Sequence, residues 1–230
     1  MILAAGRGTR LAALGLQVPK ALVDVGGEPL LARQIRYLEA QGVRHVVVNA
    51  YHLAEQVVRF VADYRGQAGV EVVVEPHLLG TAGGVRNALP LLGSGPVLVL
   101  YGDVLFDASL APMIDLHFRI RADATLALYE SREVEGKGIV HVGNDGLINR
   151  FLEKPSDLSV PRSLVNAGLY VVERDLILEL VPAGAESDFG RDVFPAALAS
   201  NRQLAAYRLP RPVLDIGTPG ALEAARELDL

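Results

Sequence analysis

A chain of 230 residues, half of them hydrophobic, is long enough to bury a sizeable core as one large α/β domain or two small ones. The net charge of −5 and the pI near 5.6 argue against a basic, nucleic-acid-binding surface. The absence of cysteine excludes disulfides and thiol catalysis, and the apolar runs are shorter than a membrane span. With an N-terminus unlike a signal peptide, these properties predict a cytoplasmic protein with neither nucleic acid nor membrane as partner.

The first half of the chain alternates β-branched runs with amphipathic stretches of helical period. A short strand at Met1–Ala4 leads into a glycine-rich turn. Further strands are expected at His45–Asn49, Val70–Val74 and Val97–Tyr101, and helices at Pro29–Gln41, Leu53–Tyr64 and Ala82–Leu89. Continuous apolar runs are typical of strands buried on both faces of a sheet. This βαβα order predicts parallel strands joined by crossover helices.

The second half has more strands and shorter turns. The strands are expected at Ala124–Glu130, Ile139–Val142, Leu147–Leu152, Val165–Val172 and Leu204–Leu209. Helices are expected at Arg174–Leu180, Arg191–Ser200 and Thr218–Leu228, the last with Thr218 as N-cap. Asn144-Asp145-Gly146 is a hairpin signal. We therefore expect an α/β, Rossmann-like fold in one domain, residues 1–230, with a mostly parallel mixed sheet flanked by helices. Its halves would be about 1–120 and a smaller β lobe at about 121–230.

The glycine-rich turn, Leu3-Ala4-Ala5-Gly6-Arg7-Gly8-Thr9-Arg10, has the composition of a phosphate cradle. Glycine lets the backbone approach the ligand, exposed N–H groups bind phosphate oxygens, and arginine neutralises their charge. No Gly-Lys-Ser/Thr follows as in a P-loop, and Leu11 stands where a dinucleotide fingerprint has its third glycine. Taken alone, the pattern is better explained as a tight turn after a strand.

The turn is followed by Pro19-Lys20, and the two elements together resemble the signature of the sugar-1-phosphate nucleotidyltransferase family, G-x-G-T-R and then P-K. Only three of the 22 basic residues are lysines, and two of them, Lys20 and Lys154, fall in such motifs. The resemblance continues in family order over nearly the whole chain: Leu79-Gly80-Thr81-Ala82-Gly83, Gly102-Asp103, Glu153-Lys154-Pro155, Asn166-Ala167-Gly168 and Asp215-Ile216-Gly217-Thr218-Pro219.

The resemblance implies a Mg²⁺-dependent enzyme that joins an NTP and a sugar 1-phosphate into a nucleotide sugar and releases pyrophosphate. Leu79–Gly83 most resembles guanylyltransferases acting on mannose or heptose 1-phosphate, with thymidylyl- and uridylyltransferases as alternatives. A catalytically silent, nucleotide-sugar-binding regulatory subunit is a rival from a different class, and a homo-oligomer stays open. A dinucleotide-binding oxidoreductase is disfavoured by the missing glycine, and a cytidylyltransferase acting on a non-sugar alcohol by Glu153-Lys154-Pro155.

The resemblance also implies roles for individual residues. Arg10, Lys20 and Asp103 would be catalytic, and Asp103 and Asp215 would bind the metal. Each aspartate follows an apolar run, and ligands of parallel sheets bind beyond the carboxyl ends of strands. A single aspartate at such a position is more often a helix cap or turn residue, but the two together in family positions favour metal binding. The nucleotide would be bound by Leu3, Ala4, Ala5, Gly6, Gly8, Thr9, Arg10, Lys20, Gly80 and Thr81. The sugar phosphate would be bound in the second half by Gly138, Glu153, Lys154 and Asn166.

Overall fold

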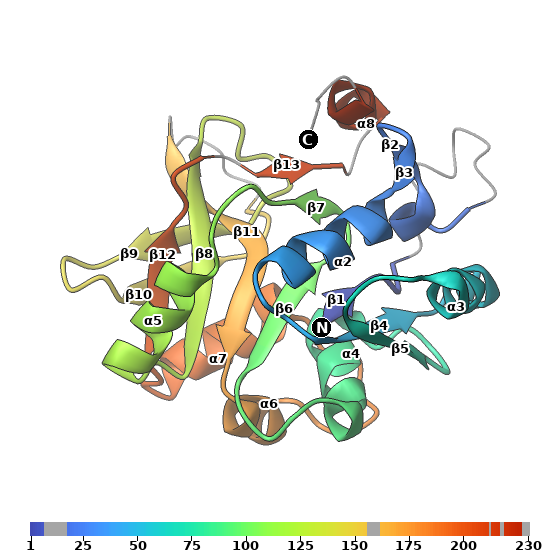
Figure 1. Ribbon diagram of the computed structural model, residues 1–230. Helices are drawn as coiled ribbons and strands as arrows, with labels where there is room; N and C mark the ends of the chain where they lie inside the picture. Colours follow the sequence, from blue (N-terminus) through green and yellow to red (C-terminus); the bar gives the residue numbers. More distant parts are fainter. Residues whose placement is uncertain (7–17, 156–161, 212, 217–218, 227–230) are drawn as a thin grey trace. The chain divides into compact units, whose positions relative to one another are not determined.

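The computed structural model describes residues 1–6, 18–155, 162–211, 213–216 and 219–226 (Figure 1). The chain forms two compact units, each discontinuous in sequence. The first unit comprises residues 1–78, 100–107 and 213–230, and the second comprises 79–99 and 108–212. The division of one nucleotidyltransferase domain into functional halves near residue 120 stays a prediction.

Parallel strands form the centre of the first unit. They are β1 (Ile2–Leu3), β4 (His45–Ala50), β5 (Gly69–Val74) and the end of β6 (Val97–Tyr101), in the order β6–β1–β4–β5. In the register of the sheet, Leu3 is paired with both Asn49 and Tyr101. The carboxyl ends of three strands therefore lie at one level, and the residues that follow them meet at one edge of the sheet.

Two helices of the first unit connect these strands. Helix α2 (Leu30–Ala40) buries Leu31, Ile35 and Leu38, the apolar face that its period predicts, and ends before Gly42 in the left-handed conformation. Helix α3 (Ala54–Asp63) is more exposed, with Val57 as its buried residue. Both lie within two residues of the bounds predicted from the sequence.

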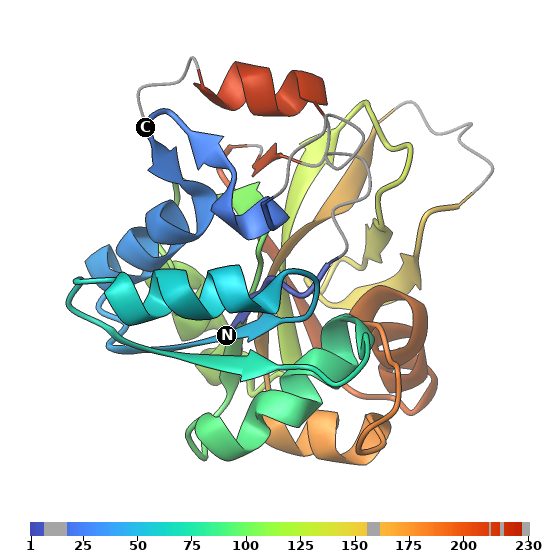
Figure 2. The same cartoon turned by 90° about the vertical axis from the view of Figure 1, so that its right-hand side faces the viewer.

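A smaller layer completes the first unit. The 3₁₀ turn η1 (Lys20–Leu22) precedes the hairpin of β2 (Asp24–Val25) and β3 (Glu28–Pro29), and β7 (Val104–Leu105) pairs antiparallel with β13 (Leu214–Asp215). Figure 2 shows helix α8 (Pro219–Arg226, red) above the hairpin (blue). The buried side chains that join these elements are Val23, Val25, Leu30, Ile216 and Leu222. This apolar cluster holds the C-terminal segment beside the residues that follow β6.

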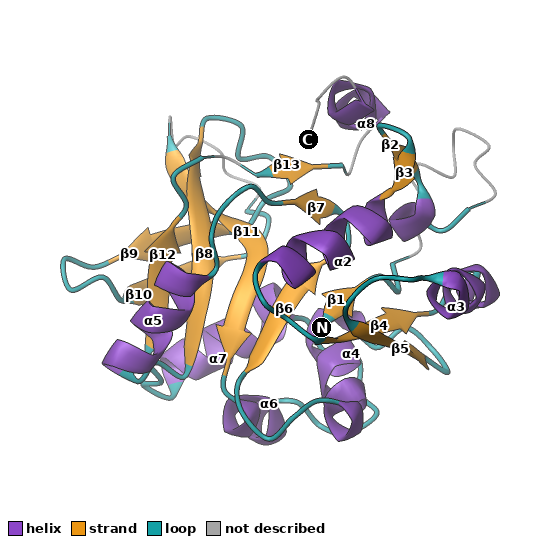
Figure 3. Ribbon diagram, viewed as in Figure 1, coloured by secondary structure: helices purple, strands orange, loops and turns teal. Residues whose placement is uncertain are grey.

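The second unit has a mostly antiparallel arrangement of strands. The strands are β8 (Ala124–Ser131), β9 (Ile139–Val142), β10 (Ile148–Leu152), β11 (Ser163–Val172) and β12 (Leu204–Arg208), in the order β10–β9–β11–β8–β12. Among these five described strands, β12 and β8 pair in parallel and the other pairs are antiparallel. Figure 3 shows β8 and β11 as the long strands. The predicted hairpin turn at residues 144–146 is confirmed, with Gly146 at φ +80° and β9 antiparallel to β10.

The helices of the second unit match the sequence prediction with two differences. They are α4 (Gly80–Ala88), η2 (Leu89–Leu91), α5 (Ala111–Ile120), α6 (Arg174–Leu180), the π-helical turn η3 (Phe189–Val193) and α7 (Phe194–Ala199). Helix α5 was missed by the sequence analysis. The helix predicted at Arg191–Ser200 begins earlier, as a π-turn, because the side chain of Asp188 accepts hydrogen bonds from its first N–H groups.

Taken together, the two units confirm the predicted α/β class, with a mostly parallel central sheet flanked by helices. Among the residues that the structure describes, no helix combines the length and apolar character needed to cross a bilayer.

Candidate functional site

The residues after β1 are held by a buried amide. The backbone N–H of Ala4 donates to Oδ1 of Asn49 at 2.7 Å, and Nδ2 of Asn49 donates to Oε1 of Glu75 at 2.6 Å. Asn49 is 2% exposed and Glu75 is 3% exposed, so this chain of hydrogen bonds is shielded from water. Neither residue was predicted from the sequence, although a polar side chain at the end of an apolar strand was a usable signal.

The predicted nucleotide loop is only partly described. Leu3, Ala4 and Ala5 lie at the end of β1, and Gly6 is exposed, with no atom within 4 Å of the position that a Cβ would take. An exposed glycine leaves its backbone accessible to a ligand. Gly8, Thr9 and Arg10 lie outside the described residues, so their roles stay predictions.

Gly102 brings the ends of β1 and β6 together. Its N–H donates to the carbonyl of Leu3 at 2.9 Å, and a Cβ at this position would overlap that carbonyl oxygen. Only glycine permits this approach without a backbone shift. As a result, Asp103 lies directly beyond the carboxyl end of β6, next to the residues that follow β1.

Lys20 and Asp103 form an ion pair in the first unit, and the backbone of Asp215 lies next to the segment of Asp103. Nζ of Lys20 lies 2.6 Å from Oδ2 of Asp103, and both side chains are partly buried. The N–H of Ile216 donates to the carbonyl of Asp103 at 2.8 Å, and Asp215 is paired with Val104 in the β13–β7 ladder. Asp103, in the turn before β7, and Asp215, in β13, thus lie on neighbouring backbone segments although they are more than a hundred residues apart in the sequence, and Lys20 contacts Asp103.

Gln34 of α2 fixes the segment that carries Asp103. Its Nε2 donates to the carbonyls of Tyr101 and Val104, each at 2.8 Å, on either side of Gly102-Asp103. Gln34 is 1% exposed, and its Oε1 has no hydrogen-bond partner among the described residues. A glutamine among Leu31, Ile35 and Leu38 on a buried face was a signal that the sequence analysis did not use.

The carboxylates of this cluster fit a metal ion that is shared with a substrate. Mg²⁺ is usually bound by one or two carboxylates together with phosphate oxygens and water. Asp103 and Asp215 would supply the two carboxylates of such a donor set. Within the described ranges no group of three or more His, Asp or Glu side chains could hold a metal. A cation bound by these two carboxylates would need further oxygen ligands, such as phosphate oxygens or water.

Glu153 is the centre of the second group of predicted residues. Its Oε2 lies against two glycines: a Cβ at Gly138 would be 3.0 Å from it, and one at Gly190 would overlap it. Burial raises the pKa of the Glu153 carboxyl, Lys154 at 3.3 Å lowers it, and the charge of Asp188 raises it. Lys154 is 61% exposed and adopts a left-handed backbone, with φ +44°. The structure thus provides a half-buried acceptor beside an exposed cation.

Asn166 lies next to this group but uses its amide locally. Its N–H donates to the carbonyl of Gly138 at 2.9 Å. Its Nδ2 donates to the hydroxyl of Tyr170 at 2.5 Å, and its Oδ1 accepts from the N–H of Gly168 at 3.1 Å. These bonds stabilise an irregularity of β11 at which Gly168 has φ +73°. A contact between Asn166 and a sugar stays a prediction.

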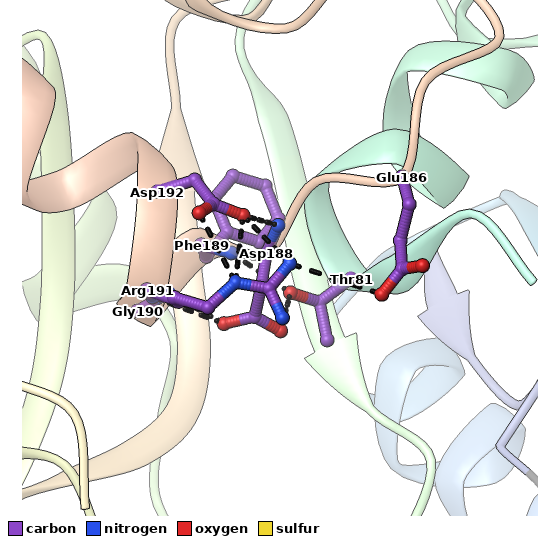
Figure 4. A network of polar contacts seen from close by, with 7 residues as sticks. All are labelled: Thr81, Glu186, Asp188, Phe189, Gly190, Arg191 and Asp192. Carbon is purple, nitrogen blue, oxygen red and sulfur yellow. Dashed lines mark hydrogen bonds and ion pairs between the residues drawn. The ribbon is translucent and has the colours of Figure 1, made fainter.

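Gly80 and Thr81, predicted to bind nucleotide with the residues after β1, belong to the second unit. They begin α4, and Gly80 has φ +72°. Figure 4 shows the side chain of Thr81 directed at Asp188, which precedes η3. The structure therefore brings Gly80 and Thr81 together with a segment that the sequence analysis did not connect to them.

Comparison with known proteins identifies the family to which the chain belongs. Residues 1–230 match the model of the family described as nucleotidyl transferase. A mannose-1-phosphate guanylyltransferase of Mycobacterium tuberculosis is 35% identical over 221 residues, which is 95% of this chain and 61% of that protein. A mannose-1-phosphate guanyltransferase of Yarrowia lipolytica is 32% identical over 226 residues, 95% of this chain and 60% of that protein. The chain spans about three-fifths of the length of these curated relatives.

A solved structure is similar over nearly its full length. The crystal structure of HddC from Yersinia pseudotuberculosis matches with a TM-score of 0.84 and 26% identity, covering 98% of this chain and 96% of that one. A second crystal structure of HddC, described as complexed with GMP-PN, matches with the same values.

Proposed function

The chain belongs to the nucleotidyl transferase family, and we propose that it transfers a nucleotidyl group from an NTP to a sugar 1-phosphate, forming a nucleotide sugar and releasing pyrophosphate. The observation that carries the proposal is the Lys20–Asp103 ion pair beyond the carboxyl end of β6, with Asp215 on the neighbouring strand β13. GTP and mannose or heptose 1-phosphate are the proposed substrates, since the relatives above are named as mannose-1-phosphate guanylyltransferases and a neighbour is described with GMP-PN.

The reaction requires charge compensation rather than a base. A phosphate oxygen of the sugar 1-phosphate forms a bond to the α-phosphorus, and the bond from that phosphorus to the pyrophosphate oxygen breaks. The nucleophile is already anionic, so no proton has to be removed from it. Two anionic substrates must nevertheless approach each other, and positioning together with positive charge accounts for catalysis in such transfers.

Residues of the first unit would bind the triphosphate. The ammonium group of Lys20, held at 2.6 Å from Asp103, is a compact cation suited to phosphate oxygens. The backbone from Leu3 to Gly6, anchored through Asn49, would bind the base and ribose. Asp103 and Asp215 would hold the divalent metal ion typical of the family, in our proposal Mg²⁺, which when bound neutralises charge on the phosphate oxygens.

Residues of the second unit would bind the acceptor. Glu153, half-buried and unobstructed by side chains at Gly138 and Gly190, would accept hydrogen bonds from sugar hydroxyls. Lys154, which is mostly exposed, would contact the sugar phosphate.

The test is pyrophosphate release in the presence of Mg²⁺, with each of the four main NTPs combined with mannose, glucose, N-acetylglucosamine and heptose 1-phosphates. We expect release to require one NTP and one sugar phosphate together, with GTP preferred. Nucleotide binding by folded protein without release from any pair would overturn the proposal and favour a silent regulatory subunit.

A further inference from the structure

The glycine-rich start of α4 is shaped to receive residues 185–188. A Cβ at Gly80 would lie 2.5 Å from the carbonyl oxygen of Ser187, and one at Gly83 would lie 2.6 Å from that of Ala185. The N–H groups of Ala82 and Gly83 both donate to the Ser187 carbonyl, at 2.9 and 3.0 Å. These glycines therefore have a packing role, because a side chain at either position would push this segment away.

The side chain of Thr81 connects α4 to the next two residues of the chain, Asp188 and Phe189. Its hydroxyl donates to Oδ2 of Asp188 at 2.7 Å and accepts from the N–H of Phe189 at 2.9 Å (Figure 4). A threonine hydroxyl has one hydrogen to donate. Because that hydrogen is used by Asp188, Thr81 has no donor left for a nucleotide in this arrangement.

Asp188 in turn fixes the backbone of Gly190 by hydrogen bonds. Its other carboxylate oxygen, Oδ1, accepts from the N–H groups of Gly190 and Arg191, at 2.9 and 3.2 Å. Its own N–H donates to Oδ2 of Asp192 at 2.7 Å, so both ends of the turn are fixed. Gly190 is buried, and the space beside its Cα is filled by the carboxylate of Glu153. A shift of this turn would therefore move the surface against which Glu153 is held.

We propose that Thr81 is a positioning residue for Glu153: through Asp188 it fixes the turn at Gly190 that holds the Glu153 carboxylate in place for the sugar. The role of Glu153 as sugar acceptor rests on the function proposed above. The physical link from Thr81 to Glu153 does not, because every contact in it lies within the second unit.

The kinetic test is a comparison of Thr81→Val with Thr81→Ser. Valine keeps the shape of threonine but removes the hydroxyl, whereas serine retains it. With the substrate pair that the pyrophosphate-release assay selects, we expect Thr81→Val to raise the KM for the sugar 1-phosphate about tenfold, in line with losing a bond to a charged group. The KM for the NTP should change less than about twofold, and Thr81→Ser should restore the wild-type values. A KM increase for the NTP alone would overturn the proposal and make Thr81 a nucleotide contact.

Gly190→Ala tests the other end of the link. The added methyl group would meet the end of a flexible side chain rather than backbone, so the fold should survive while Glu153 is displaced. We expect the same selective increase in the KM for the sugar phosphate. Gly93→Ala is the matched control, because no atom lies within 4 Å of that Cβ position. Unchanged sugar kinetics in Gly190→Ala would contradict the proposal.

A measurement without catalysis separates this inference from the proposed function. The pKa of the Glu153 carboxyl can be followed by ¹³C NMR in the wild type, Thr81→Val and Gly190→Ala. We expect the raised pKa of the wild type to move towards its ordinary value in both variants, as the carboxylate gains access to water. An identical Glu153 pKa in all three proteins would overturn the link even if the wild type were fully active. Inactive wild type with the expected pKa changes would refute only the proposed function.

Discussion

The two groups of candidate residues are held in place by different chemistry. In the first unit, the backbone around Asp103 is fixed by the uncharged amide of Gln34, whose partners are carbonyl groups. In the second unit, the surroundings of Glu153 are fixed through the carboxylates of Asp188 and Asp192. Amides do not titrate, and carboxylates do. We therefore expect the support around Asp103 to be insensitive to pH and the surroundings of Glu153 to respond to it.

The largest effect is expected from Asp103→Asn. This variant tests whether the residue that Gln34 holds in place binds the metal. Asparagine keeps the shape but removes the charge that pairs with Lys20 and would hold the cation. We expect kcat for pyrophosphate release to fall by roughly 10²–10³-fold, the range found when one preorganised charge-stabilising group is lost. Asp107→Asn, an exposed aspartate four residues along, is the control and should retain wild-type turnover. Full activity in Asp103→Asn would remove this residue from the proposed mechanism.

Gln34→Leu tests the support itself. Leucine fills a similar volume but leaves the buried carbonyls of Tyr101 and Val104 without their donor. We expect the free energy of unfolding to fall by about 2 kcal/mol and kcat to fall roughly tenfold as Asp103 loses its position. Urea unfolding at pH 5 and pH 8 should give the same loss, and the exposed Gln67→Leu should show none. A loss that differs between the two pH values would contradict an uncharged support.

The elements with strong periodicity could be predicted from the sequence. Strand β6 and helix α6 have the predicted bounds, because a continuous apolar run and an amphipathic period are local properties of the chain. Helix α5 was missed although it has a buried Met113 and His117, since its apolar residues do not form a simple stripe. The π-turn at η3 depends on the side chain of Asp188 and has no periodic signature.

The residues of the candidate site likewise fall into those that could be predicted from the sequence and those that could not. Motif residues such as Lys20, Asp103 and Glu153 were found because their neighbours in the sequence carry the pattern. Gln34 contacts Tyr101 across a separation of 67 residues. Asn49 contacts Ala4 across 45 residues and Glu75 across 26, and Asp188 contacts Thr81 across 107. Such contacts are created by strand order and helix packing. Local sequence patterns do not predict these long-range contacts. Their one local sign is a polar side chain at a position where the helix or strand period predicts an apolar one.

Glu153→Gln tests the pH response that we expect around Glu153 in the second unit. Burial raises the folded-state pKa of Glu153 above its ordinary 4.5, so the carboxyl stabilises the fold while protonated, below the unfolded pKa. That contribution is lost as the pH rises through the folded-state pKa. We expect Glu153→Gln to be more stable than wild type at pH 8, by less than about 1 kcal/mol, since the group is only half-buried. The difference should vanish below pH 4.5.

The control for this measurement is Glu135→Gln, which changes an exposed glutamate of the same unit. Its stability should follow the wild type at each pH. If Glu153→Gln were equally stable to wild type across the whole range, burial would not be the dominant influence on this carboxyl.

The smallest effect, with the opposite sign, is expected from Asp192→Asn. The hydrogen bond from Arg191 lowers the pKa of Asp192, so its contribution to stability is present above the ordinary 3.8 and is lost as the pH falls through the folded-state pKa. Asp192→Asn should therefore be slightly less stable than wild type at pH 7, by under about 0.5 kcal/mol for so exposed a pair, and equal to it once Asp192 is protonated. Because this effect depends on an exposed ion pair, 0.5 M salt should remove most of it, whereas the effect of Glu153→Gln, which comes from burial, should persist. If salt reduced the effects of both variants equally, the effect of Glu153 could not be assigned to burial and that of Asp192 to its ion pair with Arg191.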